Sequence, residues 1–159
     1  MPARRALLSA LTLALAAAAT GCKRLTPEQQ VRAAITDAEK GAEDKSLAKV
    51  AALISDQYTD HDQNDKAAIV GLLRLQFLRL PGNHLHLLVR IPSVTFPEPG
   101  RAQATALVAM ASLPLAAPAD LERASADLYR FDLTLAEEQP AHWRIRSATW
   151  APAKPSDFF

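Results

Sequence analysis

The spacing of the apolar residues changes once along this chain, near residue 84, and this change limits the folds that the chain can adopt. Before it, apolar residues recur every three or four positions and so share one face of a helix. This spacing predicts helices over 27–42, about 46–55 and about 65–80. Each predicted helix begins next to a residue that can cap it, namely Thr26, Ser46 and Asp65.

After residue 84 the apolar residues alternate with polar ones, as they do in strands with one buried face. The segment 81–83, Pro-Gly-Asn, ends the last helix, and 97–100, Pro-Glu-Pro-Gly, turns the chain. A turn over 137–141 would pair Leu133 with Ile145 on an apolar face. The same register would place Asp132 opposite Arg146 on the other face. The alternation predicts four strands, over 85–91, 102–110, 126–136 and 142–151.

Three helices followed by four antiparallel strands make an α+β domain in which the helices cover one face of the sheet. The length suits one domain with one core, which we expect over 27–151. Residues 114–120 contain prolines and are expected to form a loop. Residues 152–159 are expected to form a flexible tail, in which Phe158 or Phe159 could dock.

The first 22 residues have the three parts of a bacterial secretory signal. Arg4 and Arg5 form a charged start, residues 6–19 are almost wholly apolar, and small residues precede Cys22. The apolar run has 14 residues, fewer than the ~17–25 that span a bilayer. An export signal therefore explains this segment better than a retained transmembrane helix.

The end of this segment, Ala19-Thr20-Gly21-Cys22, resembles the lipobox of bacterial lipoprotein signals, although Ala19 stands where that family prefers leucine. The resemblance implies removal of residues 1–21 and lipidation of Cys22, with 22–26 as a tether to a membrane. The alternative is an unmodified thiol beside an ordinary cleavage site. Cys22 is the only cysteine, so no internal disulfide can form, and acylation would explain a lone thiol in an oxidising compartment.

The residue after the cysteine bears on which membrane holds the chain. Enteric lipoproteins that stay in the inner membrane usually carry aspartate there, and this chain has Lys23. The resemblance therefore implies the cell envelope, facing the periplasm, and the outer membrane in preference to the inner one.

Residues 27–151 resemble the nuclear transport factor 2-like superfamily, whose curved sheet wraps around an N-terminal helical layer. The matching features are the opening helix, a second helix that leads into Tyr58-Thr59-Asp60, a long third helix, and the closing Tyr129-Arg130-Phe131 and Trp143-Arg144-Ile145. The resemblance implies a cone-like domain. The superfamily includes isomerases, dehydratases, polyketide cyclases, binding modules and scaffold domains, so the fold alone assigns no function.

The charge balance excludes one class of partner. The chain has 18 lysines and arginines against 17 aspartates and glutamates, and removing Arg4 and Arg5 would leave 16 against 17. A face that binds nucleic acid needs an excess of cations. We therefore expect no nucleic-acid partner.

The catalytic candidates are Tyr58, Asp60 and His61, which the resemblance puts beside the mouth of the cone. A carboxylate in an apolar pocket can act as a general base, because burial raises its pKa toward the working pH. The alternative is a solvated loop in which Tyr58 packs and Asp60 makes local turn hydrogen bonds. The polarity of residues 58–64 favours this alternative.

Asp60, Asp62 and Asn64 match the start of a calcium-binding EF-hand loop. The match then fails, because Asp65 and Gly71 stand where that loop needs a glycine and a glutamate. We therefore expect no calcium site.

His84 and His86 would share one side of a strand, where two imidazoles could hold a metal. A specific zinc site needs at least a third ligand, and the sequence fixes none nearby. The sequence also lacks a glycine-rich phosphate loop and a nucleophile elbow. We expect neither a metal nor another cofactor.

These observations favour a membrane-anchored envelope lipoprotein that acts as a binding or interaction module, with a small hydrophobic ligand in the cone or a protein partner. One alternative is an isomerase, dehydratase or cyclase that uses Tyr58, Asp60 or His61. Another is a homodimeric envelope scaffold whose sheets pair face to face. An apolar pocket with a convergent acid would favour the enzyme or the binder. A filled core with an apolar patch on the sheet would favour the scaffold.

Overall fold

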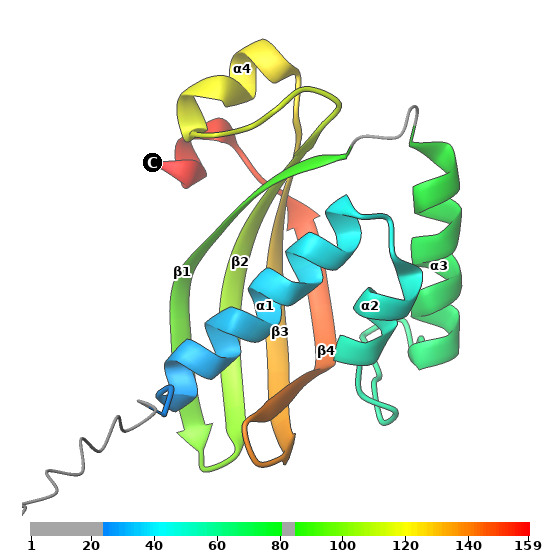
Figure 1. Cartoon of the computed structure of the whole chain (residues 1–159), viewed down its shortest axis with the longest axis vertical. Helices are drawn as coiled ribbons and strands as arrows, with labels where there is room; N and C mark the ends of the chain where they lie inside the picture. Colours follow the sequence, from blue (N-terminus) through cyan, green and yellow to red (C-terminus); the bar gives the residue numbers. More distant parts are fainter. Residues whose placement is uncertain (1–23, 81–84) are drawn as a thin grey trace, which may run out of the picture.

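The chain changes from helix to strand where the apolar spacing changes. In the computed structural model, which describes residues 24–80 and 85–159, three helices precede a four-stranded sheet (Figure 1). The predicted helix stop at 81–83 lies outside the described residues. The three helices are α1 (Pro27–Glu43), α2 (Leu47–Leu53) and α3 (Lys66–Arg79). The predicted caps Thr26, Ser46 and Asp65 are confirmed. Each of these side chains accepts a hydrogen bond from the backbone N–H of the residue three positions later in the chain.

The sheet is an antiparallel meander whose strands lie side by side in chain order. Gly100 adopts a φ of 73°, a left-handed conformation that suits glycine and closes the predicted turn between the first two strands. The predicted α+β class, with helices against a four-stranded antiparallel sheet, is confirmed. The strands are β1 (His86–Glu98), β2 (Arg101–Ala111), β3 (Asp127–Gln139) and β4 (His142–Pro152).

The connection between β2 and β3 contains more structure than the sequence indicated. A 3-10 turn (Pro118–Asp120) leads into the four-residue helix α4 (Leu121–Ala124). Four residues are too few to show a helical period, so the sequence predicted only a loop here.

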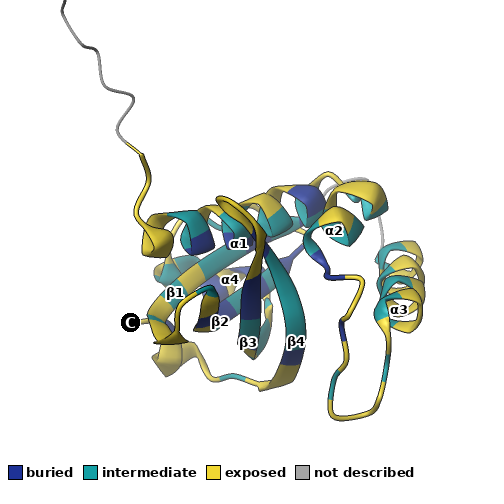
Figure 2. Cartoon of the chain, turned by 90° about the horizontal axis from the view of Figure 1, so that it is seen from below, coloured by how far each residue is buried: buried dark blue, intermediate teal, exposed yellow. Residues whose placement is uncertain are grey.

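The main core lies between α1 and the face of the sheet that α1 covers (Figure 2). Val31 and Ile35 of α1 are buried there against alternate residues of the inner strands, which is the two-residue period expected of a strand. The other buried members of this cluster are Ile54, Tyr58, Ala102, Ala104, Ala106, Leu133, Leu135, Trp143 and Ala148.

Helix α3 packs less closely than the sequence indicated. Ile69 and Leu73 contact the core cluster, but no residue of α3 is fully buried, and Leu72, Leu75 and Leu78 are exposed. The spacing of apolar residues in the sequence puts Leu72 beside Ile69 and Leu73, but in the structure Leu72 is exposed. Figure 1 shows α3 standing beside the sheet, next to α2. No helix within 24–80 or 85–159 is both long and apolar enough to cross a membrane.

The predicted register of β3 and β4 is wrong. Leu133 lies opposite Ala148, and Asp132 lies opposite Thr149. The β3–β4 turn is shorter than predicted, and the ladder skips one residue in each strand, Glu138 and Arg146. Such bulges shift the register of every residue pair beyond them. A uniform two-residue period of apolar residues in the sequence does not reveal that shift.

The free edge of β1 is covered by side chains of α1. Arg32 donates from Nη1 to the carbonyl oxygen of Ile91 at 2.8 Å, and Glu43 accepts from the N–H of Leu87 at 2.9 Å. These contacts use backbone groups that an unprotected edge strand would offer to another chain.

The C-terminal segment is not the flexible tail that we expected. Residues Pro155–Phe158 form a 3-10 turn on the face of the sheet opposite α1. Phe158 is 0% exposed, in a second apolar cluster with Leu107, Ala109 and Leu121, whereas Phe159 is 80% exposed. The tail therefore folds back and completes the domain.

We expect Phe158→Ala to lower the free energy of unfolding by ~3–5 kcal/mol, because it empties a fully buried aromatic site. Phe159→Ala is the matched control, with an expected change within ~0.5 kcal/mol. Urea unfolding followed by tryptophan fluorescence measures both. Equal stability of the two variants would contradict the docked turn.

Candidate functional site

A groove of about 710 Å³ lies between α1, the end of α2 and the β3–β4 hairpin. This volume falls within the ~300–1,000 Å³ of typical small-molecule sites. Residues one helical turn apart on α1 form one wall. The lining residues are Arg24, Leu25, Gln30, Ala33, Ala34, Asp37, Ala52, Leu53, Glu137, Pro140, Ala141, His142, Trp143 and Arg144.

Trp143 links the groove to the core. Its side chain is almost fully buried, and its indole Nε1 donates to the Gln30 Oε1 atom at 2.9 Å. The ring of Phe96 also contacts the indole of Trp143 in an edge-on arrangement, with ring centroids 5.8 Å apart. One buried aromatic residue thus fixes the strand wall and the helix wall of the groove relative to each other.

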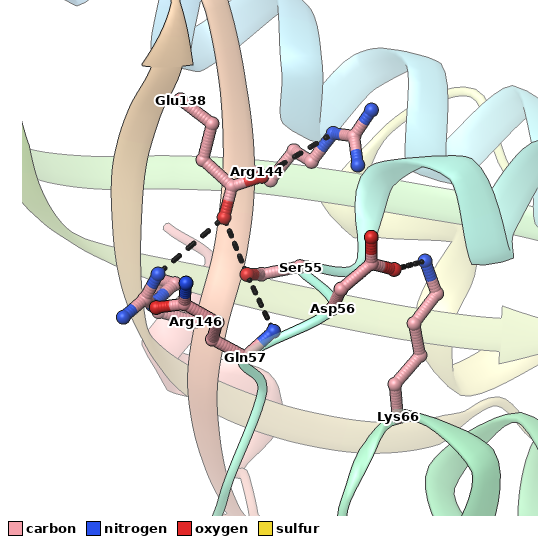
Figure 3. A network of polar contacts seen from close by, with 7 residues as sticks. All are labelled: Ser55, Asp56, Gln57, Lys66, Glu138, Arg144 and Arg146. Carbon is pink, nitrogen blue, oxygen red and sulfur yellow. Dashed lines mark hydrogen bonds and ion pairs between the residues drawn. The ribbon is translucent and has the colours of Figure 1, made fainter.

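A polar network behind the groove wall fixes Arg144 (Figure 3). Ser55, which is 0% exposed, donates its hydroxyl to Oε1 of Glu138 and accepts from the N–H of Gln57 at 3.0 Å. The Glu138 carboxylate also lies 3.5 Å from Nη1 of Arg146 and 3.7 Å from Nε of Arg144. Glu138 and Arg146 are the two residues that the β3–β4 ladder skips. The Glu138 side chain contacts Ser55, and the Arg146 side chain contacts Glu138.

Tyr58 lies apart from the groove and packs in the main core. Its hydroxyl lies 3.5 Å from Oδ2 of Asp60. Burial raises the pKa of Tyr58 to about 12, and the negative charge of Asp60 and the hydrogen bond to it act in the same direction. The phenol therefore stays protonated at neutral pH.

Asp60 organises the loop that follows. Its Oδ1 accepts from the backbone N–H groups of Asp62 and Asn64, both at 3.0 Å, and its Oδ2 accepts from Nδ2 of Asn64 at 3.0 Å. Partial desolvation raises the pKa of Asp60, but the hydrogen bonds from Asn64 and Asp62 outweigh it and lower the pKa below the ordinary value of 3.8. This geometry favours the local-turn interpretation over a general base.

His61 does not line the groove either. Its Nε2 lies 3.2 Å from Oδ2 of Asp62, and its ring meets the edge of Trp150 at a centroid distance of 6.0 Å. Tyr58, Asp60 and His61 are therefore neighbours, as the sequence suggested, but none of the three lines the groove.

The metal candidates gain no geometric support. Within the described part of the chain, no three His, Cys, Asp or Glu side chains are grouped so that they could hold a metal ion. His84 lies outside the described residues, so the pairing of His84 with His86 stays a prediction.

The groove residues were not predicted, because they come from four separate parts of the chain. One signal was available: Gln30, Ala33, Ala34 and Asp37 recur at helical spacing beside the apolar stripe of α1. Small residues next to a buried stripe leave room beside a helix. The sequence does not indicate which segment forms the opposite wall.

We expect the pKa of the Asp60 carboxyl, followed by carbon-detected NMR, to lie below 3.8. Asn64→Ala should raise it, because the variant removes the hydrogen bonds that Nδ2 of Asn64 donates to both oxygens of the ionised form. With a lowered pKa in the folded state, Asp60 stabilises the fold above its unfolded pKa, and this contribution is lost as the pH falls through the folded pKa. A midpoint above 3.8 would instead support the general-base interpretation.

No protein-family profile matches the sequence, and no curated protein sequence matches it significantly. Solved structures do match the fold. A Novosphingobium aromaticivorans protein named after scytalone dehydratase has a TM-score of 0.62 and 9% identity, covering 80% of this chain and 84% of that one. A ketosteroid isomerase-like protein from Erwinia carotovora atroseptica has a TM-score of 0.57 and 10% identity, covering 79% and 95%.

A third structure, a nuclear transport factor 2-like protein of unknown function from Pseudomonas putida, has a TM-score of 0.57 and 17% identity, covering 83% of this chain and 91% of that one. Identities this low carry over the fold and no activity. The domain has the nuclear transport factor 2-like fold, which isomerase-like and dehydratase-like proteins share.

Proposed function

We propose that this chain is a cell-envelope lipoprotein, anchored by lipid on Cys22 and facing the periplasm, that binds a small amphipathic molecule in the groove beside α1. The observation that carries the proposal is the groove itself, whose volume and mixed lining suit a small ligand. The anchor is supported by the signal-like segment that ends at Cys22.

The groove would lie close to the membrane. Arg24 and Leu25 line it, and they follow Cys22 by two and three residues. An extended chain spans at most ~3.6 Å per residue, so lipid on Cys22 would hold Leu25 within ~11 Å of the anchor point. A molecule that leaves or enters the bilayer could therefore reach the groove directly.

The lining favours a ligand with an apolar body and a polar group. Leu25 and Leu53 offer apolar surface, while Asp37 and Glu137 offer negative charge and Arg24 and Arg144 offer positive charge. This mixture does not favour a strongly charged ligand, because each sign of charge on the ligand would meet its like in the groove. An amphipathic ligand differs from the small hydrophobic ligand in the cone that the sequence suggested.

Catalysis by Tyr58, Asp60 or His61 has less support than binding. The names of two structural neighbours refer to an isomerase and a dehydratase, but the likeness extends to the fold alone. In this chain the carboxylate of Asp60 is engaged in its own loop, and none of the three residues lines the groove.

A scaffold built by pairing sheets face to face has less support too. On the face opposite α1, two rows of polar residues cross all four strands, and face-to-face pairing would bury them. The rows are Ser93, Thr105, Asp132 and Thr149, and Thr95, Gln103, Thr134 and Ser147. At one end of this face, Leu107 and Ala109 of β2 pack against Leu121 of α4 and Phe158 of the C-terminal turn.

Native mass spectrometry of the intact protein, gently extracted from its own membranes, tests both halves of the proposal. We expect a mass increment on Cys22 from the acyl groups and a second, non-covalent increment from the ligand. Ala33→Trp should lower ligand occupancy at least tenfold, because Ala33 is exposed and lines the groove.

Ala48→Trp is the matched control, since Ala48 is exposed on α2 and does not line the groove. An unmodified Cys22 would overturn the anchor. A chain without any bound molecule, or equal occupancy in the two tryptophan variants, would overturn the binding site.

A further inference from the structure

Helix α3 has an apolar face on its outer side that the rest of the described chain leaves uncovered. Ile69 and Leu73 point toward the core, whereas Leu72, Leu75 and Leu78 lie on the opposite side and are exposed. A helix that is apolar on both sides is normally buried on both sides. The outer face of α3 is therefore suited to a partner.

The charges along this region are divided between its two ends. Asp62 and Asp65 lie just before the helix, Arg74 and Arg79 lie in its second half, and no acidic residue occurs between 66 and 79. Lys66, at the acidic end, is paired with Asp56 at 2.7 Å. Among the residues that the structure describes, no carboxylate lies within ion-pair distance of Arg74 or Arg79. One end of the region is thus acidic and the other basic, with leucines between them.

We propose that α3 packs antiparallel against α3 of a second copy of this chain. Antiparallel pairing about a two-fold axis brings the basic end of each helix to the acidic end of the other, which makes this surface complementary to itself. Leu72 and Leu75 would meet their counterparts near the axis. A Cβ at Gly71 would contact nothing, so this part of the face leaves room for the partner's leucines.

The other candidate occupant of this face is the membrane, and the geometry disfavours it. Figure 1 shows the described chain starting on the side of the domain opposite α3. Helix α1, which has 17 residues and lies between them, is ~25 Å long. The tether over 22–26 reaches at most ~18 Å. This step rests on the proposed anchor at Cys22, whereas the self-complementarity of α3 does not.

The contact is small. Helix α3 has 14 residues and a length of ~21 Å, so it offers less than the ~800 Å² per partner of a standard interface. Such a pair is weak in dilute solution. Two copies held on one membrane meet at a higher effective concentration, which favours the pair without new contacts. The dimer should therefore be sought in the membrane.

Photo-cross-linking of the full chain in intact cells tests this directly. We place p-benzoylphenylalanine at position 75 and, as the control, at position 113, because Leu75 and Leu113 are 51% and 52% exposed. We expect position 75 to give a product of twice the chain mass that carries both tags of two differently tagged copies. Position 113 should give at least fivefold less of it. A cross-link to another protein or to lipid, or no cross-link at position 75, would overturn the proposal.

Two further variants test the charge pairing. Arg79→Glu should lower the cross-linked fraction at least fivefold, because it puts a carboxylate beside Asp62 and Asp65 of the other copy. Arg79→Lys keeps the charge and should retain most of the product. Equal yields from the two variants would overturn the antiparallel arrangement. Loss of the chain from the membrane fraction reports failure of the anchor separately, because it is measured before irradiation.

Discussion

The arrangement of this domain depends on how residues 54–59 are held along the outer edge of β4. The N–H of Ser55 donates to the carbonyl oxygen of Ile145 at 2.9 Å, and the N–H of Thr59 donates to that of Arg146 at 3.0 Å. The Ser55 hydroxyl adds a bond to Glu138, which two arginines also contact. A buried hydroxyl and a partly buried carboxylate are costly unless they are paired, so this network favours one position for the segment. That position fixes where α2 ends, and therefore one wall of the groove. It also fixes where α3 begins.

Local chemistry was enough to predict most of the fold. The helix caps Thr26, Ser46 and Asp65 act over three residues, and the two-residue period of β2 follows from one covered face, so both are visible in the sequence. The register of β3 and β4 was not predictable in this way. It depends on Glu138 and Arg146 leaving the ladder, and the partner of the Glu138 side chain is Ser55, more than 80 residues before it. The docking of Phe158 likewise depends on Leu107 and Leu121, which are distant in sequence.

The candidate site, like the fold, could be predicted from the sequence only in part. Tyr58, Asp60 and His61 were candidates because the family resemblance puts them beside the mouth of the cone, and the structure brings Tyr58 and Asp60 into contact. The groove, by contrast, is formed by the first described residues, two helices and a hairpin, so no single stretch of the sequence indicates it. The outer face of α3 was missed for another reason. The helix is apolar nearly all round, and a period that has no polar side cannot tell which leucines face inward.

The most direct test of this account is amide hydrogen exchange at Ser55 and Thr59 in the wild-type chain. If residues 54–59 are held along β4, both amides should exchange about as slowly as the interior amides of β4 itself, because both must open the sheet edge to reach water. The groove would then have a fixed wall and α3 a fixed start. Exchange at the rate of exposed loop amides would contradict the account, because the segment would not be held and the groove would have no permanent shape.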